Sequence, residues 1–328
     1  MNWQWPVAIV APALVALAVI ALLVRSAWAG RLVDRPNERS LHVVPTPRVG
    51  GLGVMAGALP VAACFADAPL LVPLACAAIL AVISCADDRQ SLPIQVRLPA
   101  HVGAAVIAVL AIGSPDGIHP GLNPLAATLS IVGLVWMTNL FNFMDGSDGL
   151  AGGMAAIGFG AFALAAAHAA FMPLALVSAA IASASAGFLA RNFPPARVFL
   201  GDAGSIPLGF LAGALGLHGW LAGAWPPWFP LLVFSPFIAD ASITILARIA
   251  RREPFWRAHR GHYYQRLVLA GWTPARLALS AYALMIAAAA SALVGQGSGG
   301  QVRVGIILVW AAGLALLFLA VERRARAP

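Results

Sequence analysis

Apolar runs of about 20 residues, separated by short polar clusters, follow one another along almost the whole chain. As a helix, a run of this length crosses the hydrocarbon core of a bilayer. Only 10% of the 328 residues are charged, against about 25% in an average soluble domain, and the mean hydropathy is +0.87. These values exclude a soluble globule and a disordered chain. The sequence therefore predicts an all-α polytopic membrane protein.

The runs predict about eleven transmembrane helices in a single integral-membrane domain over residues 1–328. They lie near 6–26, 49–66, 69–86, 99–113, 125–144, 150–170, 173–191, 205–224, 229–248, 276–295 and 302–321. No basic residue precedes the first run, as it would in a signal peptide, so we expect this run to be a retained helix.

Arginine predicts the orientation of the bundle, because all 20 basic residues are arginine. With the N-terminus outside, nineteen of them fall on the inner side and only Arg303 on the outer side. By the positive-inside rule, the N-terminus is expected in the periplasm and the C-terminus in the cytoplasm. The inner loops then lie near 27–48, 87–98, 145–149, 192–204 and 249–275.

Several classes of function are disfavoured by what the sequence lacks. Without lysine there can be no Walker A loop and no Schiff base. No basic soluble face is available for nucleic acid, and we see no inverted repeat of the kind found in secondary transporters. The three cysteines lie in apolar segments without CxxC spacing, which is typical of core residues.

Acidic residues gather at the predicted inner face. Asp87 and Asp88 close the third predicted helix, where two neighbouring carboxylates repel each other. Neutralisation by Arg89 or Arg97 in a solvated loop is one interpretation. A bound cation, or work as a base, is the interpretation that we favour at a membrane edge.

The string NFMDGSDGLAGG at 142–153 ends the fifth predicted helix. Asn142, Asp145 and Asp148 are spaced by three residues, so a continuing helix would align them in one stripe. The alternative is a turn in which Asp148 caps the next helix. Capping explains one carboxylate, whereas the group of three polar side chains indicates a ligand site.

Asp202 lies in FLGDAGS, at 199–205, just before the eighth predicted helix. It is either a helix N-cap or an ion ligand, and the free N–H groups that follow it could bind an anion. Asn192 and Phe199 share this loop, and Phe199 either packs in the core or stacks on a base.

The last inner loop, 249–275, contains His259, Arg260 and His262 among aromatic residues. Zinc would need a further nitrogen or sulfur ligand, and membrane-surface anchoring is another alternative. We favour a phosphate-binding segment, with Arg48 of the first inner loop as a similar candidate.

Asp240 lies about eight residues from the inner end of its predicted helix, roughly 12 Å deep. Two interpretations stay open. An ionisable group at that depth is typical of a functional site, or Asp240 is a buried structural partner for Arg248 or a loop arginine.

Together the inner loops offer oxygen ligands that suit Mg²⁺, and arginine and histidine side chains that suit phosphate. Because these groups lie at a lipid–water boundary, they indicate a transfer between a soluble diphosphate and a membrane-held acceptor. A polyprenyl-phosphate carrier without chemistry and another Mg²⁺-dependent lipid-phosphate enzyme, such as an alcohol phosphotransferase, are the alternatives.

In this order, the strings resemble the polyprenyl-phosphate N-acetylhexosamine-1-phosphate transferases (the MraY/WecA superfamily, glycosyltransferase family 4), over about residues 31–275. The resemblance implies transfer of a sugar-1-phosphate from a UDP-activated amino sugar to undecaprenyl phosphate, with release of UMP. It also implies Mg²⁺, for which Mn²⁺ could substitute, and an active site on the cytoplasmic face of the bacterial inner membrane. A homodimer is compatible with it.

Site roles follow from the same resemblance. It implies Asp202 and Asn142 as metal ligands. It implies Asp87, Asp88 and His262 as catalytic residues, with Asp87 assisting the attacking lipid phosphate. The substrate-binding residues that it implies are Asp145, Asp148, Asn192, Phe199, His259, Arg260, Arg48 and Arg97.

One motif departs from many family members, which carry a histidine-rich cluster in the last loop. Here the string is HRGHYYQRL, at 259–267. It resembles the branch that initiates O-antigen or related surface polysaccharides with deoxy-N-acetylsugars such as FucNAc or QuiNAc. A role in peptidoglycan synthesis is accordingly disfavoured.

Overall fold

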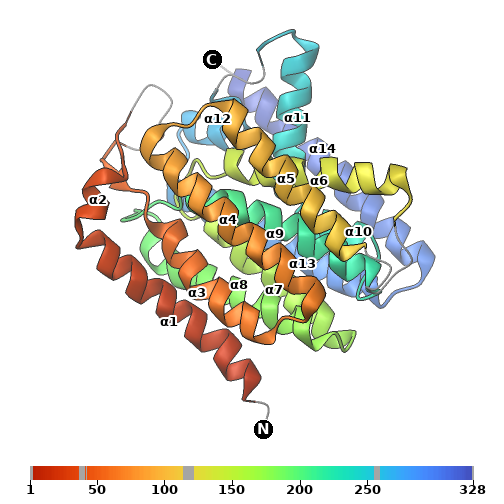
Figure 1. Ribbon diagram of the computed structural model, residues 1–328. Coiled ribbons are helices and arrows are strands. Elements are labelled where there is room, and N and C mark those ends of the chain that lie inside the picture. The colour runs from red at the N-terminus through yellow and green to blue at the C-terminus, as the bar shows by residue number, and fades with distance from the viewer. Residues whose placement is uncertain (1–2, 37–40, 42, 114–121, 255–258, 327–328) are drawn as a thin grey trace.

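The computed structural model describes residues 3–36, 41, 43–113, 122–254 and 259–326, and these fold almost entirely into helices (Figure 1). Parts of the predicted loops 27–48 and 249–275 lie outside the described residues. The long helices follow the predicted runs in order. They are α1 (Gln4–Val24), α3 (Gly50–Phe65), α4 (Ala68–Gln90), α5 (Ile94–Ile112), α6 (Pro124–Phe143), α7 (Leu150–His168), α8 (Met172–Asn192), α9 (Asp202–Leu221), α13 (Pro274–Gln296) and α14 (Gly300–Arg326).

Eight helices of the described chain are long and apolar enough to cross a membrane, which confirms a polytopic membrane protein. They are α1, α4, α5, α6, α7, α8, α13 and α14. The prediction of one continuous helix over 229–248 is wrong. That run forms α10 (Trp228–Val233) and α11 (Ser235–Ala250), and Pro236 in the first turn of α11 accounts for the break, since proline cannot donate an intrahelical hydrogen bond.

Smaller elements occupy the predicted loops. They are α2 (Ala27–Arg31), α12 (Tyr263–Leu269) and a two-stranded antiparallel ribbon of β1 (Val33–Asp34) and β2 (Thr46–Pro47). In this ribbon Asp34 pairs with Thr46. The ribbon therefore brings Asp34 close to Arg48, which follows β2.

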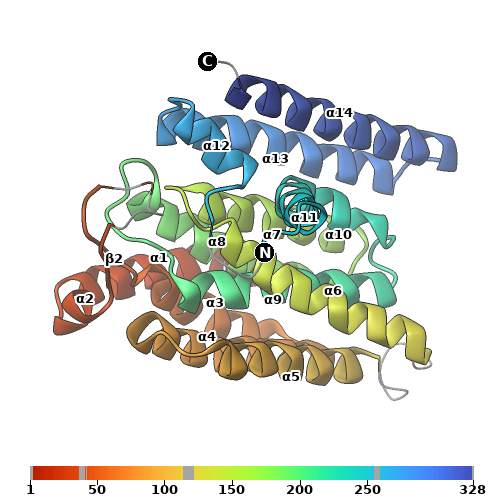
Figure 2. The same cartoon turned by 90° about the horizontal axis from the view of Figure 1, so that it is seen from above.

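The helices pack in layers around α9. In Figure 2, α4 and α5 lie along one side of the molecule, α13 and α14 lie along the opposite side, and α9 runs between them. Nearly every side chain of α9 from Ala203 to Gly219 is buried. A helix that is apolar all round is typical of such an enclosed position.

Glycines bring α3 against the amino end of α9. A Cβ atom at Gly51 would lie 2.2 Å from the backbone nitrogen of Gly204. The backbone N–H groups of Gly50 and Gly51 donate to the carbonyl oxygens of Phe199 and Leu200 at 2.9 and 2.8 Å. This contact fixes the segment that leads into Asp202.

Candidate functional site

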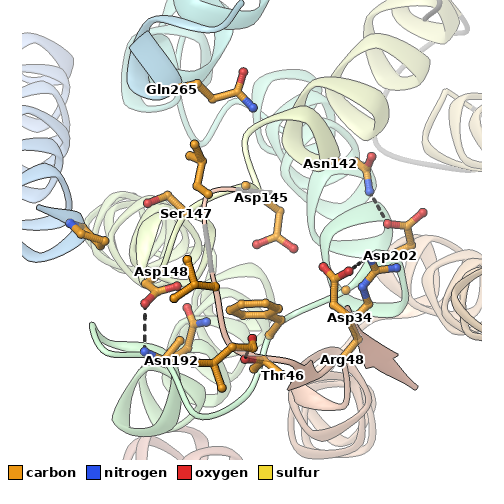
Figure 3. Close-up of a pocket in the computed structure, with 18 of the residues that line it drawn as sticks. Asp34, Thr46, Arg48, Asn142, Asp145, Ser147, Asp148, Asn192, Asp202 and Gln265 are labelled. Atoms are coloured by element: carbon orange, nitrogen blue, oxygen red, sulfur yellow. Dashed lines mark hydrogen bonds and ion pairs between the residues drawn. The ribbon is translucent and has the colours of Figure 1, made fainter. Parts of the chain in front are cut away.

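A cavity of about 730 Å³ opens where the polar helix ends meet (Figure 3). Its lining comes from five segments that are distant in sequence, within residues 34–48, 91, 142–148, 192–202 and 259–274. These segments lie in, or directly beside, the five predicted inner loops. The fold thus gathers the polar loops of the chain around one space.

Asn142 and Asp202 face each other at one side of this cavity (Figure 3). The Asn142 side-chain amide donates to Asp202 Oδ1 at 2.8 Å and to Ser205 Oγ at 3.0 Å. Asp202 is the first residue of α9, and the N-cap position is held by Gly201, whose φ of 70° suits glycine. The N-cap interpretation of Asp202 is therefore wrong, and its carboxylate lines the cavity.

Asp145 lies in the turn between α6 and α7. Since α6 ends at Phe143, the expected helical stripe of Asn142, Asp145 and Asp148 does not form. Burial raises the pKa of Asp145 well above its usual range, and repulsion from Asp202 and Asp88 adds to the rise. A bound cation would offset this repulsion between the carboxylates.

Asp148 and Asn192 hold the same turn in place. The Asp148 carboxylate accepts from the backbone nitrogen of Ala196 at 2.9 Å, and it does not cap α7, whose N-cap is Gly149. The Asn192 carbonyl oxygen accepts from the Gly149 nitrogen at 2.9 Å, and its amide donates to the Val198 carbonyl at 2.9 Å. Both side chains therefore join the turn to the segment that carries Phe199.

Arg48 links three elements beside the cavity. It forms an ion pair with Asp34 at 2.8 Å and faces Asp88 at 3.5 Å. Asp88 Oδ2 accepts from the backbone nitrogen of Ala203 at 3.1 Å. Asp88 Oδ1 is buried and accepts no hydrogen bond, and it is the oxygen that faces the Arg48 guanidinium. Asp88 therefore lies beside the cavity rather than in its wall.

Asp87 points elsewhere and does not line the cavity. Its carboxylate accepts from the Leu92 nitrogen at 2.6 Å and from Arg97 at 2.9 Å. The prediction that a loop begins at 87 is wrong, because α4 continues to Gln90 and only residues 91–93 connect it to α5. Ser91 of this connection does line the cavity.

The last loop contributes His259 and Gln265 to the cavity wall. Burial and the nearby His262 and arginines lower the pKa of His259 to about 4, so its ring is neutral at pH 7 without a ligand. Its Nδ1 accepts from the Gly261 nitrogen at 3.0 Å, which leaves the proton on Nε2.

His262, Arg260 and Arg97 do not line the cavity. The His262 ring is buried and stacks on the rings of His259 and Phe143, whose centroids lie 4.9 and 6.0 Å from its own. These three residues would therefore affect a ligand in the cavity through neighbouring residues rather than by direct contact.

Asp240 does have a structural partner, but it is not an arginine. Its carboxylate accepts from the backbone nitrogens of Tyr263 and Tyr264 at 2.9 and 3.0 Å. Arg248, the partner that the sequence suggested, pairs with Glu253 at 2.7 Å instead. The choice of partner depends on how the last loop folds back, which the spacing of charges does not encode.

The donor set fits a cation that arrives with a phosphate ligand. In the described part of the chain, no three His, Cys, Asp or Glu side chains form a ready-made metal group. Mg²⁺ is usually held by one or two carboxylates, waters and substrate phosphates rather than by a protein cage. Asp202 and Asp145 supply carboxylate oxygen atoms of this kind in the cavity wall, and Asn142 adds an amide oxygen.

Sequence reasoning missed Asp34, Ser147 and Gln265, all of which line the cavity. The acid–base pairing of Asp34 with Arg48 spans 14 positions of one loop, so periodicity could not reveal it. Ser147 lies between Asp145 and Asp148 in the sequence. Its polar side chain within that motif could have identified it as a site residue.

Comparison with known proteins places the same segments in one family. Residues 70–219, from α4 to α9, match the model of glycosyl transferase family 4. A probable undecaprenyl-phosphate N-acetylglucosaminyl 1-phosphate transferase of Bacillus subtilis is 28% identical, over 88% of this chain and 84% of that protein. The undecaprenyl-phosphate alpha-N-acetylglucosaminyl 1-phosphate transferase of Yersinia pestis is 30% identical, over 80% and 76%. A decaprenyl-phosphate N-acetylglucosaminephosphotransferase of Mycobacterium leprae is 27% identical, over 89% and 84%.

Proposed function

Because the chain belongs to glycosyl transferase family 4, the polyprenyl-phosphate N-acetylhexosamine-1-phosphate transferases, we propose that it moves a sugar-1-phosphate from a UDP-sugar to undecaprenyl phosphate. The observation that carries this proposal is the convergence of Asn142 of α6, Asp145 of the turn after α6 and Asp202 of α9 on one cavity. The site would work at the cytoplasmic face of a bacterial inner membrane.

In the proposed reaction, an oxygen of the lipid phosphate attacks the β-phosphorus of the UDP-sugar. A new oxygen–phosphorus bond forms, the bond between the β-phosphorus and the bridging oxygen breaks, and UMP leaves with that oxygen. Because a phosphate monoester is largely ionised at pH 7, the protein's main tasks are to position the two anions and to offset their repulsion.

Mg²⁺, or Mn²⁺ in its place, would be held by Asp202 and Asn142, with Asp145 and Asp88 close by. When bound, the metal would neutralise charge on the diphosphate. Arg48 adds a fixed positive charge beside these carboxylates. The neutral His259 can donate its Nε2 proton to a phosphate oxygen.

The two substrates would enter different parts of the site. Phe199 lines the cavity and is proposed to stack on uracil, next to the turn held by Asp148 and Asn192. Asp87 and Arg97, at the connection between α4 and α5, are proposed to receive the lipid phosphate. Arg260 and His262, which lie next to His259 and outside the cavity wall, would help to orient the His259 ring.

The donor is proposed to carry an N-acetylhexosamine or a deoxy-N-acetylhexosamine, and the product would be the first lipid-linked intermediate of O-antigen or another surface polysaccharide. The string HRGHYYQRL supports this branch, because Tyr263, Tyr264 and Gln265 stand in the last loop where many relatives have a histidine cluster.

Release of UMP tests the function directly. Purified protein would receive undecaprenyl phosphate, Mg²⁺ and a panel of UDP-sugars, and one or a few sugars should give UMP and a lipid-linked sugar. Omission of the metal should stop the release. If the folded protein releases no UMP with any donor, the proposal is refuted, and a lipid carrier without chemistry becomes the better interpretation.

A further inference from the structure

We infer that Asp240 is a positioning residue, which holds the segment 259–265 in the cavity wall and so sets the affinity for the nucleotide-sugar. Asp240 lies in α11 and does not line the cavity. The inference rests on the proposed function, because it assigns a role in binding the donor of that reaction.

The Asp240 carboxylate is buried, with 4% of the residue exposed, and both of its oxygens accept hydrogen bonds. Oδ1 accepts from the Tyr263 nitrogen at 2.9 Å and from Thr244 Oγ1 at 3.3 Å, and it lies 3.3 Å from Nδ1 of His262. Oδ2 accepts from the Tyr264 nitrogen at 3.0 Å. The carboxylate therefore grips the amino end of α12 and the ring beside it.

The interaction between the Asp240 carboxylate and the amino end of α12 depends on the direction of the helix. The first N–H groups of a helix have no partner within the helix, and a carboxylate there also interacts favourably with the helix dipole. A buried carboxylate without such donors would be costly. Asp240 and the amino end of α12 consequently satisfy each other, and α12 is held to α11 at a defined distance.

From α12, two contacts lead to the cavity. Gln265, which lines the wall (Figure 3), accepts from the His262 backbone nitrogen through Oε1 at 3.2 Å. The Tyr264 hydroxyl donates to the Phe143 carbonyl at 3.1 Å, and a Cβ atom at Gly146 would lie 2.1 Å from that hydroxyl oxygen. A shift of α12 would therefore move both Gln265 and the turn that carries Asp145.

Asp240→Asn tests the inference, because it keeps the side-chain volume and one acceptor but replaces the other acceptor by an amide that cannot accept from Tyr264. We expect KM for the UDP-sugar to rise by about tenfold or more, while KM for undecaprenyl phosphate stays within about twofold. Amide hydrogen exchange in the peptide 259–269 should become faster.

Glu322→Gln is the matched control. Glu322 of α14 contacts the same helix through the Tyr263 hydroxyl at 2.9 Å and Arg266 at 3.8 Å. These contacts are made to side chains rather than to the amino end of α12, and none of the three residues lines the cavity. This variant should leave both KM values within about twofold of wild type.

Two results for Asp240→Asn would overturn the inference. One is a donor KM within about twofold together with unchanged exchange in 259–269, and the other is an equal rise in both KM values. If Asp240→Asn does not fold, Thr244→Val removes one donor to Oδ1 at similar volume and should raise the donor KM alone by about three- to fivefold. A normal KM in that folded variant would refute the inference.

A wild-type protein that releases no UMP would instead refute the proposed function, whereas the exchange comparison would still test the link to α12.

Discussion

At the scale of single residues, the buried and half-buried carboxylates divide into two kinds. Those of Asp148, which also lines the cavity, and of Asp240 accept from backbone N–H donors, so their main effect is to hold segments together. Asp145 and Asp202 line the cavity, and Asp88 lies beside them with Oδ1 facing Arg48. Mutual repulsion among these three is unfavourable without a ligand, which is typical of a site that binds a cation.

Asp202→Ala should abolish turnover without unfolding the bundle. The variant removes a metal ligand of the proposed site and one of the two acceptors of the Asn142 amide, so we expect kcat/KM to fall by more than about 100-fold. Thermal unfolding monitored alongside the UMP assay would show whether the fold is intact. Turnover near that of wild type would contradict the assignment.

Asp67→Ala is the control for this variant. Asp67 caps α4 at the end opposite Asp88 and accepts from the Leu70 nitrogen at 3.3 Å. Its loss should cost about 1 kcal/mol of folding stability and leave turnover within about twofold.

The raised pKa of Asp145 predicts a proton release on binding of Mg²⁺ and UDP. Burial and the neighbouring carboxylates raise the pKa of Asp145 well above its usual range, so at any pH below that pKa a cation must displace a proton. Metal affinity should therefore increase as pH rises through the pKa of this group. Calorimetry in buffers of different ionisation enthalpy would measure the protons released, and Asp145→Asn should reduce the number. Equal proton release by the two proteins would contradict the prediction.

At the scale of elements, the contact of α3 with α9 depends on glycine. Gly51→Ala would place a Cβ atom 2.2 Å from the Gly204 nitrogen, and both partners are backbone that cannot move aside. We expect a loss of about 1–3 kcal/mol in folding stability and a lower kcat, because Leu200, which accepts from the Gly51 nitrogen, leads into Asp202.

Gly103→Ala in α5 is the matched control, since no atom lies within 4 Å of the added Cβ. Alanine in a helix interior is favoured over glycine by up to about 1 kcal/mol, so this variant should be as stable as wild type or more so. Thermal unfolding in the same detergent compares the two. A Gly51→Ala protein as stable as Gly103→Ala would contradict the close packing.

Hydropathy predicted the helices well because their length is set by the bilayer. The predicted runs 125–144 and 173–191 differ by one residue at each end from α6 and α8. Elements whose formation depends on tertiary contacts were missed. The short α12 is held by Asp240 of α11, and its seven residues are too few for a periodic pattern that would predict a helix.

The site was predictable as a set of residue types but not as a set of contacts. Carboxylates at helix ends pointed to the cavity because nearly all arginines and most acidic residues share one predicted face. The directions in which Asp87 and Asp88 point depend on α4 continuing to Gln90. Neighbouring helix positions point about 100° apart, so one carboxylate meets Arg97 and the other meets Arg48.

At the scale of the whole molecule, the cavity and the arginine-rich helix ends lie together. Arg191, Arg248 and Arg276 stand at the ends of α8, α11 and α13 that lead into the cavity segments, whereas Arg303 begins α14 at the other end. Moving so many cations across the membrane during insertion would be unfavourable. The soluble donor of the proposed reaction would reach the site from the same side.

Labelling of single cysteines from each side of the membrane tests this orientation. In a chain whose three cysteines are replaced by alanine, Arg197→Cys and Arg251→Cys introduce exposed thiols at the cavity end, and Asn123→Cys and Gly299→Cys introduce them at the opposite end. An impermeant maleimide added to intact cells should react with the second pair alone, and all four should react after permeabilisation. If Arg197→Cys and Arg251→Cys react from different sides of the membrane, their loops cannot share one cavity, because a polar loop does not cross lipid.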